Sequence, residues 1–118
     1  MANNLQVFRN EQFGEIRTIE ENGNVLFCGS DVAKALGYAR PSDAVSAHCR
    51  YTAKRSIPHP QSPGKTLEVT FLTEGDVYRL IAHSQLPSAE KFEKWVFDEV
   101  LPTIRKTGGY VANDDLFL

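Results

Sequence analysis

Apolar and polar residues alternate along two short stretches near the start of the chain, residues 5–9 and 15–19. A period of two is typical of half-buried β-strands. Turn residues separate these stretches, and Asn22-Gly23-Asn24 marks a second turn before the apolar run 25–28. The start of the chain therefore predicts a small antiparallel sheet.

Two short helices are predicted after this sheet. Ser30 is placed to cap the first helix, and Gly37 is placed to end it in a left-handed conformation. Pro41 suits the first turn of the second helix, which runs to about Cys49. The spacing of Ala33 and Gly37 predicts close packing of the pair, as in a helix-turn-helix, whose second helix enters the DNA major groove. An ordinary pair of core-packing helices explains the same spacing.

A β-hairpin is predicted next, with strands at residues 51–57 and 66–72. The loop between them holds three prolines and a glycine, which exclude it from a strand interior. Basic residues cluster at or near this loop. A basic hairpin beside a helix-turn-helix is the layout of a winged DNA-binding domain, and a solvated surface loop is the alternative.

Two further helices are predicted in the C-terminal part. Thr73, three residues before Asp76, starts the first of them in near capping-box form. Ser88 is placed to cap the second, longer helix, in which Trp95 recurs with other apolar residues at helical spacing and so belongs to the core. Pro102 is expected to break or restart this helix. The fold class predicted is α+β: a small antiparallel sheet and a hairpin packed with about four helices, including a helix-turn-helix-like pair.

Charge is unevenly distributed along the chain. The net charge is −2, yet residues 34–65 contain six basic residues and one acid, whereas the remainder contains seven basic residues and fourteen acids. A cationic surface attracts polyanions. We therefore expect this basic segment to contact double-stranded DNA, unless folding scatters its residues over different faces. The expected DNA-binding residues are Lys34, Arg40, Ser42, Arg50, Lys54, Arg55 and Lys65.

No catalytic or metal-binding constellation is predicted, and no cofactor is expected. Gly64-Lys65-Thr66 resembles the end of a phosphate-binding loop, but it precedes a strand instead of following one. The scattered cysteines and histidines lack the spacing of a zinc site, and Cys28 and Cys49 are expected to be free thiols. A triad of Ser30, Asp31 and His48 lacks the nucleophile-elbow motif. The sequence therefore does not predict an enzyme.

The sequence shows neither a signal peptide nor an apolar run long enough to span a bilayer. We accordingly expect a cytoplasmic protein without a membrane partner.

Three stretches are more specific than any of these motifs: residues 27–38 (FCGSDVAKALGY), 72–81 (LTEGDVYRLI) and 89–108 (AEKFEKWVFDEVLPTIRKTG). In their order and spacing they resemble the Bro N-terminal domain family of phage and prophage antirepressors and large DNA viruses. The resemblance covers about residues 5–110, so we expect a domain at 1–110 and a linker or disordered tail at 111–118.

The resemblance implies an α+β fold, DNA binding as the usual role, a bacterial host cell, and a different C-terminal domain behind this one. Antirepression also implies an alternative function, a protein-interaction module that binds and inactivates a phage repressor. A homodimer is compatible with either function, because many DNA-binding domains mirror two-fold sites.

Overall fold

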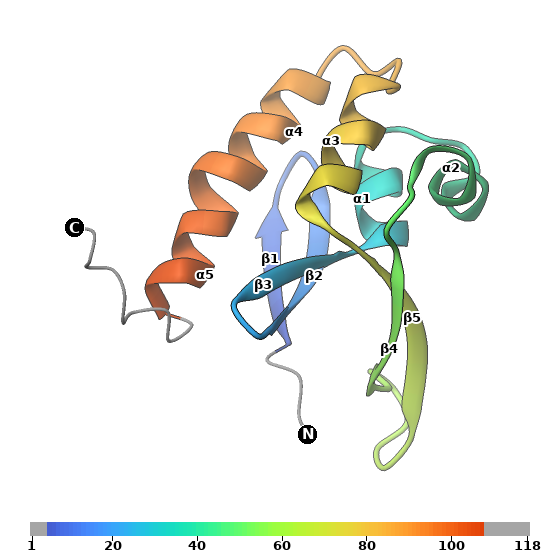
Figure 1. Ribbon diagram of the computed structural model, residues 1–118, viewed down its shortest axis with the longest axis vertical. Helices are drawn as coiled ribbons and strands as arrows, with labels where there is room; N and C mark the ends of the chain where they lie inside the picture. Colours follow the sequence, from blue (N-terminus) through green and yellow to red (C-terminus); the bar gives the residue numbers. More distant parts are fainter. Residues whose placement is uncertain (1–4, 108–118) are drawn as a thin grey trace.

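The computed structural model describes residues 5–107 of the chain. One five-stranded antiparallel sheet has the strand order β1-β2-β3-β5-β4 (Figure 1). The predicted N-terminal sheet and hairpin are thus parts of a single sheet, joined where Phe27 pairs with Leu72 and Cys28 with Phe71. The strands are β1 (Gln6–Asn10), β2 (Gly14–Glu21), β3 (Asn24–Cys28), β4 (Ala53–Pro58) and β5 (Thr66–Leu72).

Helices occupy the two connections that the sequence predicts. The pair between β3 and β4 is α1 (Gly29–Ala35) and α2 (Pro41–His48), and the segment after β5 begins with α3 (Glu74–Ala82). The α+β prediction is confirmed. Figure 1 shows the β4–β5 hairpin extending away from the helices, with α2 beside its base. None of the described helices is both long and apolar enough to cross a membrane.

The last helix is less regular than predicted. It runs through α4 (Ala89–Trp95), a π-helical turn η1 (Val96–Val100) and α5 (Leu101–Thr107). Pro102 therefore does not break the helix. Leu101 donates its N–H to the Val96 carbonyl, five residues back, and this wider turn lies next to the proline ring that would otherwise clash with the preceding turn. The predicted tail 111–118 lies outside the described residues.

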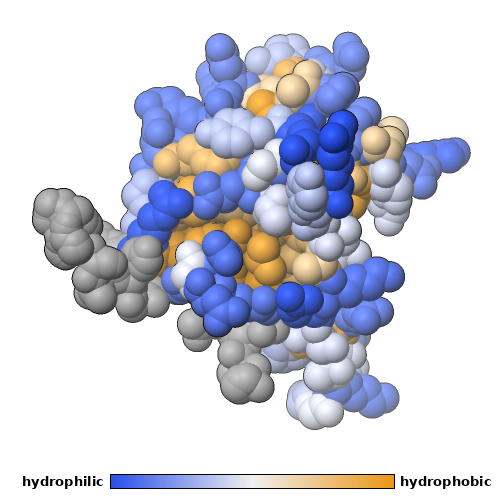
Figure 2. Space-filling view, in the orientation of Figure 1, coloured by the Kyte–Doolittle hydropathy of each residue, from blue (hydrophilic) through white to orange (hydrophobic). Residues whose placement is uncertain are grey.

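Both faces of strand β3 are buried, which explains its unbroken apolar sequence. Phe27 belongs to the main core beneath the helices, together with Leu72 and Phe92. Leu26 and Cys28 point the other way, into a second cluster with three residues of other strands, Ile19, Ile57 and Phe71. Figure 2 shows a hydrophobic area in the middle of one face of the molecule, over β3.

Helix ends test the capping predictions individually. The prediction for Ser30 was wrong, because α1 begins two residues earlier, at Gly29, with Cys28 at the N-cap position. Gly37 does take the left-handed conformation, at φ +82°. The Thr73 hydroxyl accepts the Asp76 N–H at 3.2 Å, which confirms that cap. Ser88 occupies the N-cap position of α4, but its side chain makes no capping hydrogen bond.

Candidate nucleic-acid interface

The helical pair packs closely, and Gly29 is the glycine at its tightest described contact. A Cβ atom on Gly29 would lie 3.2 Å from the Val45 side chain of α2 and 3.2 Å from the Thr70 carbonyl oxygen of β5. A Cβ on Gly37 would instead meet Leu86, which follows α3. Gly37 therefore packs against Leu86, and Gly29 is the glycine that lets α1, α2 and the hairpin meet.

A groove of about 660 Å³ lies between this helical pair and the base of the hairpin. Helix α2 contributes Ser42 and Ser46, which are four residues apart and so share one helix face. The hairpin contributes Lys54 and Thr70, which are directly opposite each other on β4 and β5. Two of the predicted DNA-binding residues, Ser42 and Lys54, are thus brought together across one groove.

The two faces of the hairpin differ in chemistry. Because side chains alternate along a strand, Lys54 faces the groove and its neighbour Arg55 faces the opposite side. Arg55 donates to the Glu21 carboxylate of β2 at 2.7 Å and 3.1 Å. This bond lowers the pKa of Glu21 and raises that of Arg55. Lys54 makes no ion pair with any residue in the described range.

The other predicted DNA-binding residues do not line the groove. Arg40 immediately precedes α2 and is exposed, with a 3.4 Å ion pair to Asp43 one turn along. Arg50 follows α2 and is exposed; Lys34 is exposed in the last turn of α1. Lys65 lies at the far end of the hairpin, where its carbonyl accepts the His59 N–H at 2.9 Å. These four exposed cations therefore lie on α1, at the two ends of α2 and at the tip of the hairpin.

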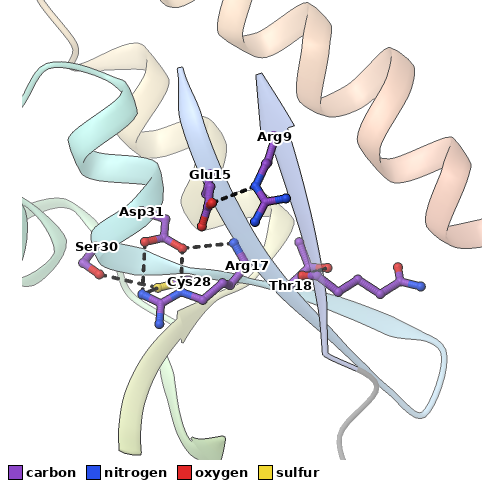
Figure 3. Close-up of polar contacts among 8 residues, drawn as sticks. Arg9, Glu15, Arg17, Thr18, Cys28, Ser30 and Asp31 are labelled. Carbon is purple, nitrogen blue, oxygen red and sulfur yellow. Dashed lines mark hydrogen bonds and ion pairs between the residues drawn. The ribbon is translucent and has the colours of Figure 1, made fainter. Parts of the chain in front are cut away.

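Arg17 is a groove residue that the sequence analysis missed. It comes from β2 and is held by Asp31 of α1, which accepts both the Arg17 backbone N–H at 3.0 Å and its guanidinium at 2.9 Å and 3.1 Å (Figure 3). The guanidinium also approaches the buried Cys28 Sγ at 3.3 Å. Hydrogen bonding to Asp31 raises the pKa of Arg17, and burial raises the pKa of Cys28. No local pattern marks Arg17, because its partner lies 14 residues away.

The connection from α2 to β4 is fixed by a second carboxylate. Asp76 is completely buried and accepts the backbone N–H groups of Arg50 at 2.9 Å and Tyr51 at 2.8 Å. It also accepts from the Arg79 guanidinium at 2.8 Å. Arg79 in turn lies 5.4 Å from the centre of the exposed Tyr51 ring. The geometry of the chain between α2 and the hairpin, and hence of the groove, depends on this residue.

A family model for the BRO family, N-terminal domain, matches residues 15–102, well over half of the chain and every residue that lines the groove. The chain belongs to the BRO family. No solved structure matches this Bro-N domain closely enough to compare.

Curated relatives carry the same domain in longer proteins. An uncharacterised protein of Haemophilus influenzae is 45% identical over 78% of this chain and 45% of its own length. The Bro-N domain-containing protein 289L of Invertebrate iridescent virus 6 is 34% identical over 76% of this chain and 26% of its own length. The Bro-N domain-containing protein L2 of Acanthamoeba polyphaga mimivirus is 31% identical over 92% of this chain and 49% of its own length. The match therefore spans about half or less of these relatives.

Within the Bro-N domain, the cysteines and histidines do not gather into a metal site: residues 5–107 contain no group of three metal-ligating side chains. The rings of His48 and His83 stack at 4.3 Å, and both cysteines are unpaired thiols. Burial, followed by the nearby Asp76 carboxylate, raises the pKa of the half-buried Cys49 to about 11.

A second surface feature lies between α3 and the π-helical turn. The rings of Tyr78 and Phe97 are parallel, with centres 4.3 Å apart, and Tyr78 is 45% exposed. They line a shallow depression whose rim is charged, including Lys94, which pairs with Asp98 at 3.1 Å. No local pattern predicts this pair, since Tyr78 lies in α3 and Phe97 in η1.

Proposed function

We propose that this chain is the DNA-binding regulatory domain of a phage or prophage antirepressor. The observation that carries the proposal is the groove between α2 and the hairpin, where Ser42 and Lys54 face the same space. Lysine, arginine and hydroxyl side chains are the usual partners of DNA phosphates. Arg55 is left out of the proposed surface, because it points away from the groove and pairs with Glu21.

The surrounding cations extend this surface. Arg40 and Arg50 lie at the two ends of α2, and both side chains are exposed. Lys65, at the tip of the hairpin, would follow the DNA backbone at a distance from the groove. In this arrangement α2 faces the duplex and the hairpin acts as a wing.

The test is fluorescence anisotropy with random-sequence duplex DNA over a series of salt concentrations. If about four cations meet phosphates, log affinity should fall with log salt at a slope of about −3 to −4. Lys54→Gln should make this slope shallower by about one. Arg55→Gln is the matched control, because it removes one charge from the adjacent position on the opposite face, and it should leave the slope nearly unchanged. A salt-insensitive wild-type affinity would overturn the proposal.

A second candidate function is binding and inactivation of a phage repressor. The observation that favours it is the exposed Tyr78–Phe97 stack, because aromatic residues within a charged rim are typical of protein-interaction hot spots. This depression is lined by α3, α4 and η1 and shares no residue with the groove.

The two functions separate experimentally through Tyr78→Ala. Biolayer interferometry against individually purified phage repressors should detect binding by the wild type and at least a 10-fold weaker affinity for the variant, as expected for a hot-spot tyrosine. DNA binding by Tyr78→Ala should be unchanged. Equal repressor binding by the two proteins would exclude this surface as the repressor site.

A further inference from the structure

We propose that the groove between α2 and the hairpin binds one sugar–phosphate unit, a phosphate ester of a nucleoside, and so holds a single backbone position of a nucleic-acid strand. This proposal rests on the proposed function, since it states which chemical group occupies the groove. Three features of the groove support it: free hydroxyl groups, one unpaired cation, and a wall that combines polar and apolar side chains.

The hydroxyl groups are available for a ligand. Ser42 and Ser46 of α2, and Thr52 and Thr70 of the hairpin segment, all line the groove. None of these four side chains hydrogen-bonds to another residue in the described range. Hydroxyl groups that converge from two sides can donate to phosphate oxygens and accept from sugar hydroxyls.

The charges in the groove suit a single phosphate better than a polyphosphate. Arg17 is neutralised by its double contact with Asp31, which leaves Lys54 as the unpaired cation of the lining. Glu68 lies on the same face of the hairpin as Lys54, but it pairs with Ser56, two residues closer to the hairpin tip. Its carboxylate repels phosphate from that end. The favourable position for one phosphate is therefore the end where Lys54 and Thr70 are paired.

The helix side of the groove supplies an apolar contact. Val45 lies between Ser42 and Ser46 along α2 and lines the groove with them. The Val45 side chain packs against Gly29 of α1, where a Cβ atom would lie only 3.2 Å away, and this contact fixes its position. An apolar side chain flanked by hydroxyls fits a sugar ring, whose carbon face is apolar and whose edges carry oxygen atoms.

The test is an NMR titration of the full chain, following backbone amide shifts with three probes: inorganic phosphate, thymidine monophosphate and a short random-sequence duplex. The test variant is Ser46→Ala/Thr70→Val, which removes two groove hydroxyls without changing charge. The control is Ser62→Ala/Thr66→Val, at the far end of the same hairpin. Thermal unfolding establishes that both variants are folded.

The expected result is that thymidine monophosphate shifts amides of α2 and the hairpin base at lower concentration than inorganic phosphate does. The groove variant should bind both the nucleotide and the duplex about 10-fold more weakly, the effect of losing two hydrogen bonds to a ligand. Its salt slope should equal that of the wild type, and the control should match the wild type in every measurement.

The outcomes separate this proposal from DNA binding in general. If the wild type binds the duplex and the groove variant binds it equally well, the sugar–phosphate proposal is overturned and the proposed function stands. If the nucleotide shifts the groove amides and the duplex does not bind, the groove takes a free nucleotide and the proposed function falls. If no probe shifts these amides, both proposals fall.

Discussion

Two carboxylates, Asp31 and Asp76, fix parts of the chain near the groove in different ways. Asp76, on the α3 side, is completely buried and fixes the backbone of the α2–β4 connection through the N–H groups of Arg50 and Tyr51. Asp31, on the α1 side, has a side chain that is 13% exposed and mainly fixes the side chain of Arg17, with one backbone contact. Both lie in the first turn of a helix.

The difference between them concerns what each residue controls. Removing Asp76 would free a chain segment on which the whole interface depends, whereas removing Asp31 would free one guanidinium that can turn toward water. A buried acceptor with several backbone donors costs more to lose than a partly exposed ion pair. Asp76 should therefore matter chiefly for stability, and Asp31 for the charge and shape of the groove.

The largest effect is expected for Asp76→Ala. This change leaves two backbone N–H groups and Arg79 without their acceptor, and it should lower the free energy of unfolding by about 2–4 kcal/mol. Urea unfolding followed by circular dichroism measures it. Asp43→Ala, an acid also in the first turn of a helix but exposed, is the control. If the free energy of unfolding falls no more than in the control, Asp76 does not stabilise the α2–β4 connection.

Asp31→Ala should have a smaller effect on stability, about 1–2 kcal/mol, because Arg17 is partly exposed and can be solvated. The same variant removes the carboxylate that neutralises Arg17, so its affinity for duplex DNA should rise at low salt. If urea titration shows that this variant loses as much stability as Asp76→Ala, the two carboxylates do not differ in their structural role.

The thiol beside Asp76 gives a test at alkaline pH. The folded chain raises the pKa of Cys49 to about 11, so the fold favours its neutral form. The associated stability is fully present below the ordinary thiol pKa and is lost as the pH rises from about 9 toward 11. Urea unfolding at several pH values should show a decline over this range that is smaller in Cys49→Ala.

The same thiol should react slowly in the folded protein. Alkylation of Cys49 by iodoacetamide at pH 8 should be at least about 10-fold slower than in the urea-unfolded chain, because less thiolate is present. A Cys28→Ala variant isolates the reaction of Cys49. Equal rates in the folded and unfolded chains would mean that the Asp76 region does not shield the thiol.

The smallest effect is expected for Arg40→Ala. Its pair with Asp43 is largely exposed, so the free energy of unfolding should change by less than about 0.5 kcal/mol. Affinity for DNA should nevertheless fall, because Arg40 belongs to the proposed surface. A stability change comparable to that of Asp31→Ala would contradict the distinction between buried and exposed carboxylates.

Local patterns predicted most of the secondary structure. Alternation marked the strands, Gly37 marked the end of α1, and Thr73 marked the start of α3, as the structure confirms. The errors came where distant residues decide the local geometry. Ser30 is not a cap, because Gly29 begins the helix where α1 touches α2 and β5. Pro102 does not break the last helix: a π-helical turn precedes it, and α5 begins at Leu101.

The candidate site was predicted less completely than the fold. The charge pattern singled out Lys54, and the helix-turn-helix pattern singled out Ser42; both line the groove. The charge pattern also selected Arg55, which lies on the other face of the same strand. Charge along a sequence does not show which face of a strand a side chain occupies. Thr70 follows from strand alternation once the pairing with Lys54 is known. Arg17 has no local signal.

The sequence by itself determined the α+β class, the order of the elements and, through the three family stretches, membership in the BRO family. These depend on periodicity, turn residues and residue identity, which are all local. Only the tertiary structure decided that β3 joins β5, that the groove forms on the Lys54 face of β4, and that Asp31 and Asp76 fix Arg17 and the α2–β4 connection. Each of these depends on contacts between residues far apart in the chain, which form only when the core excludes water and the buried polar groups must find partners.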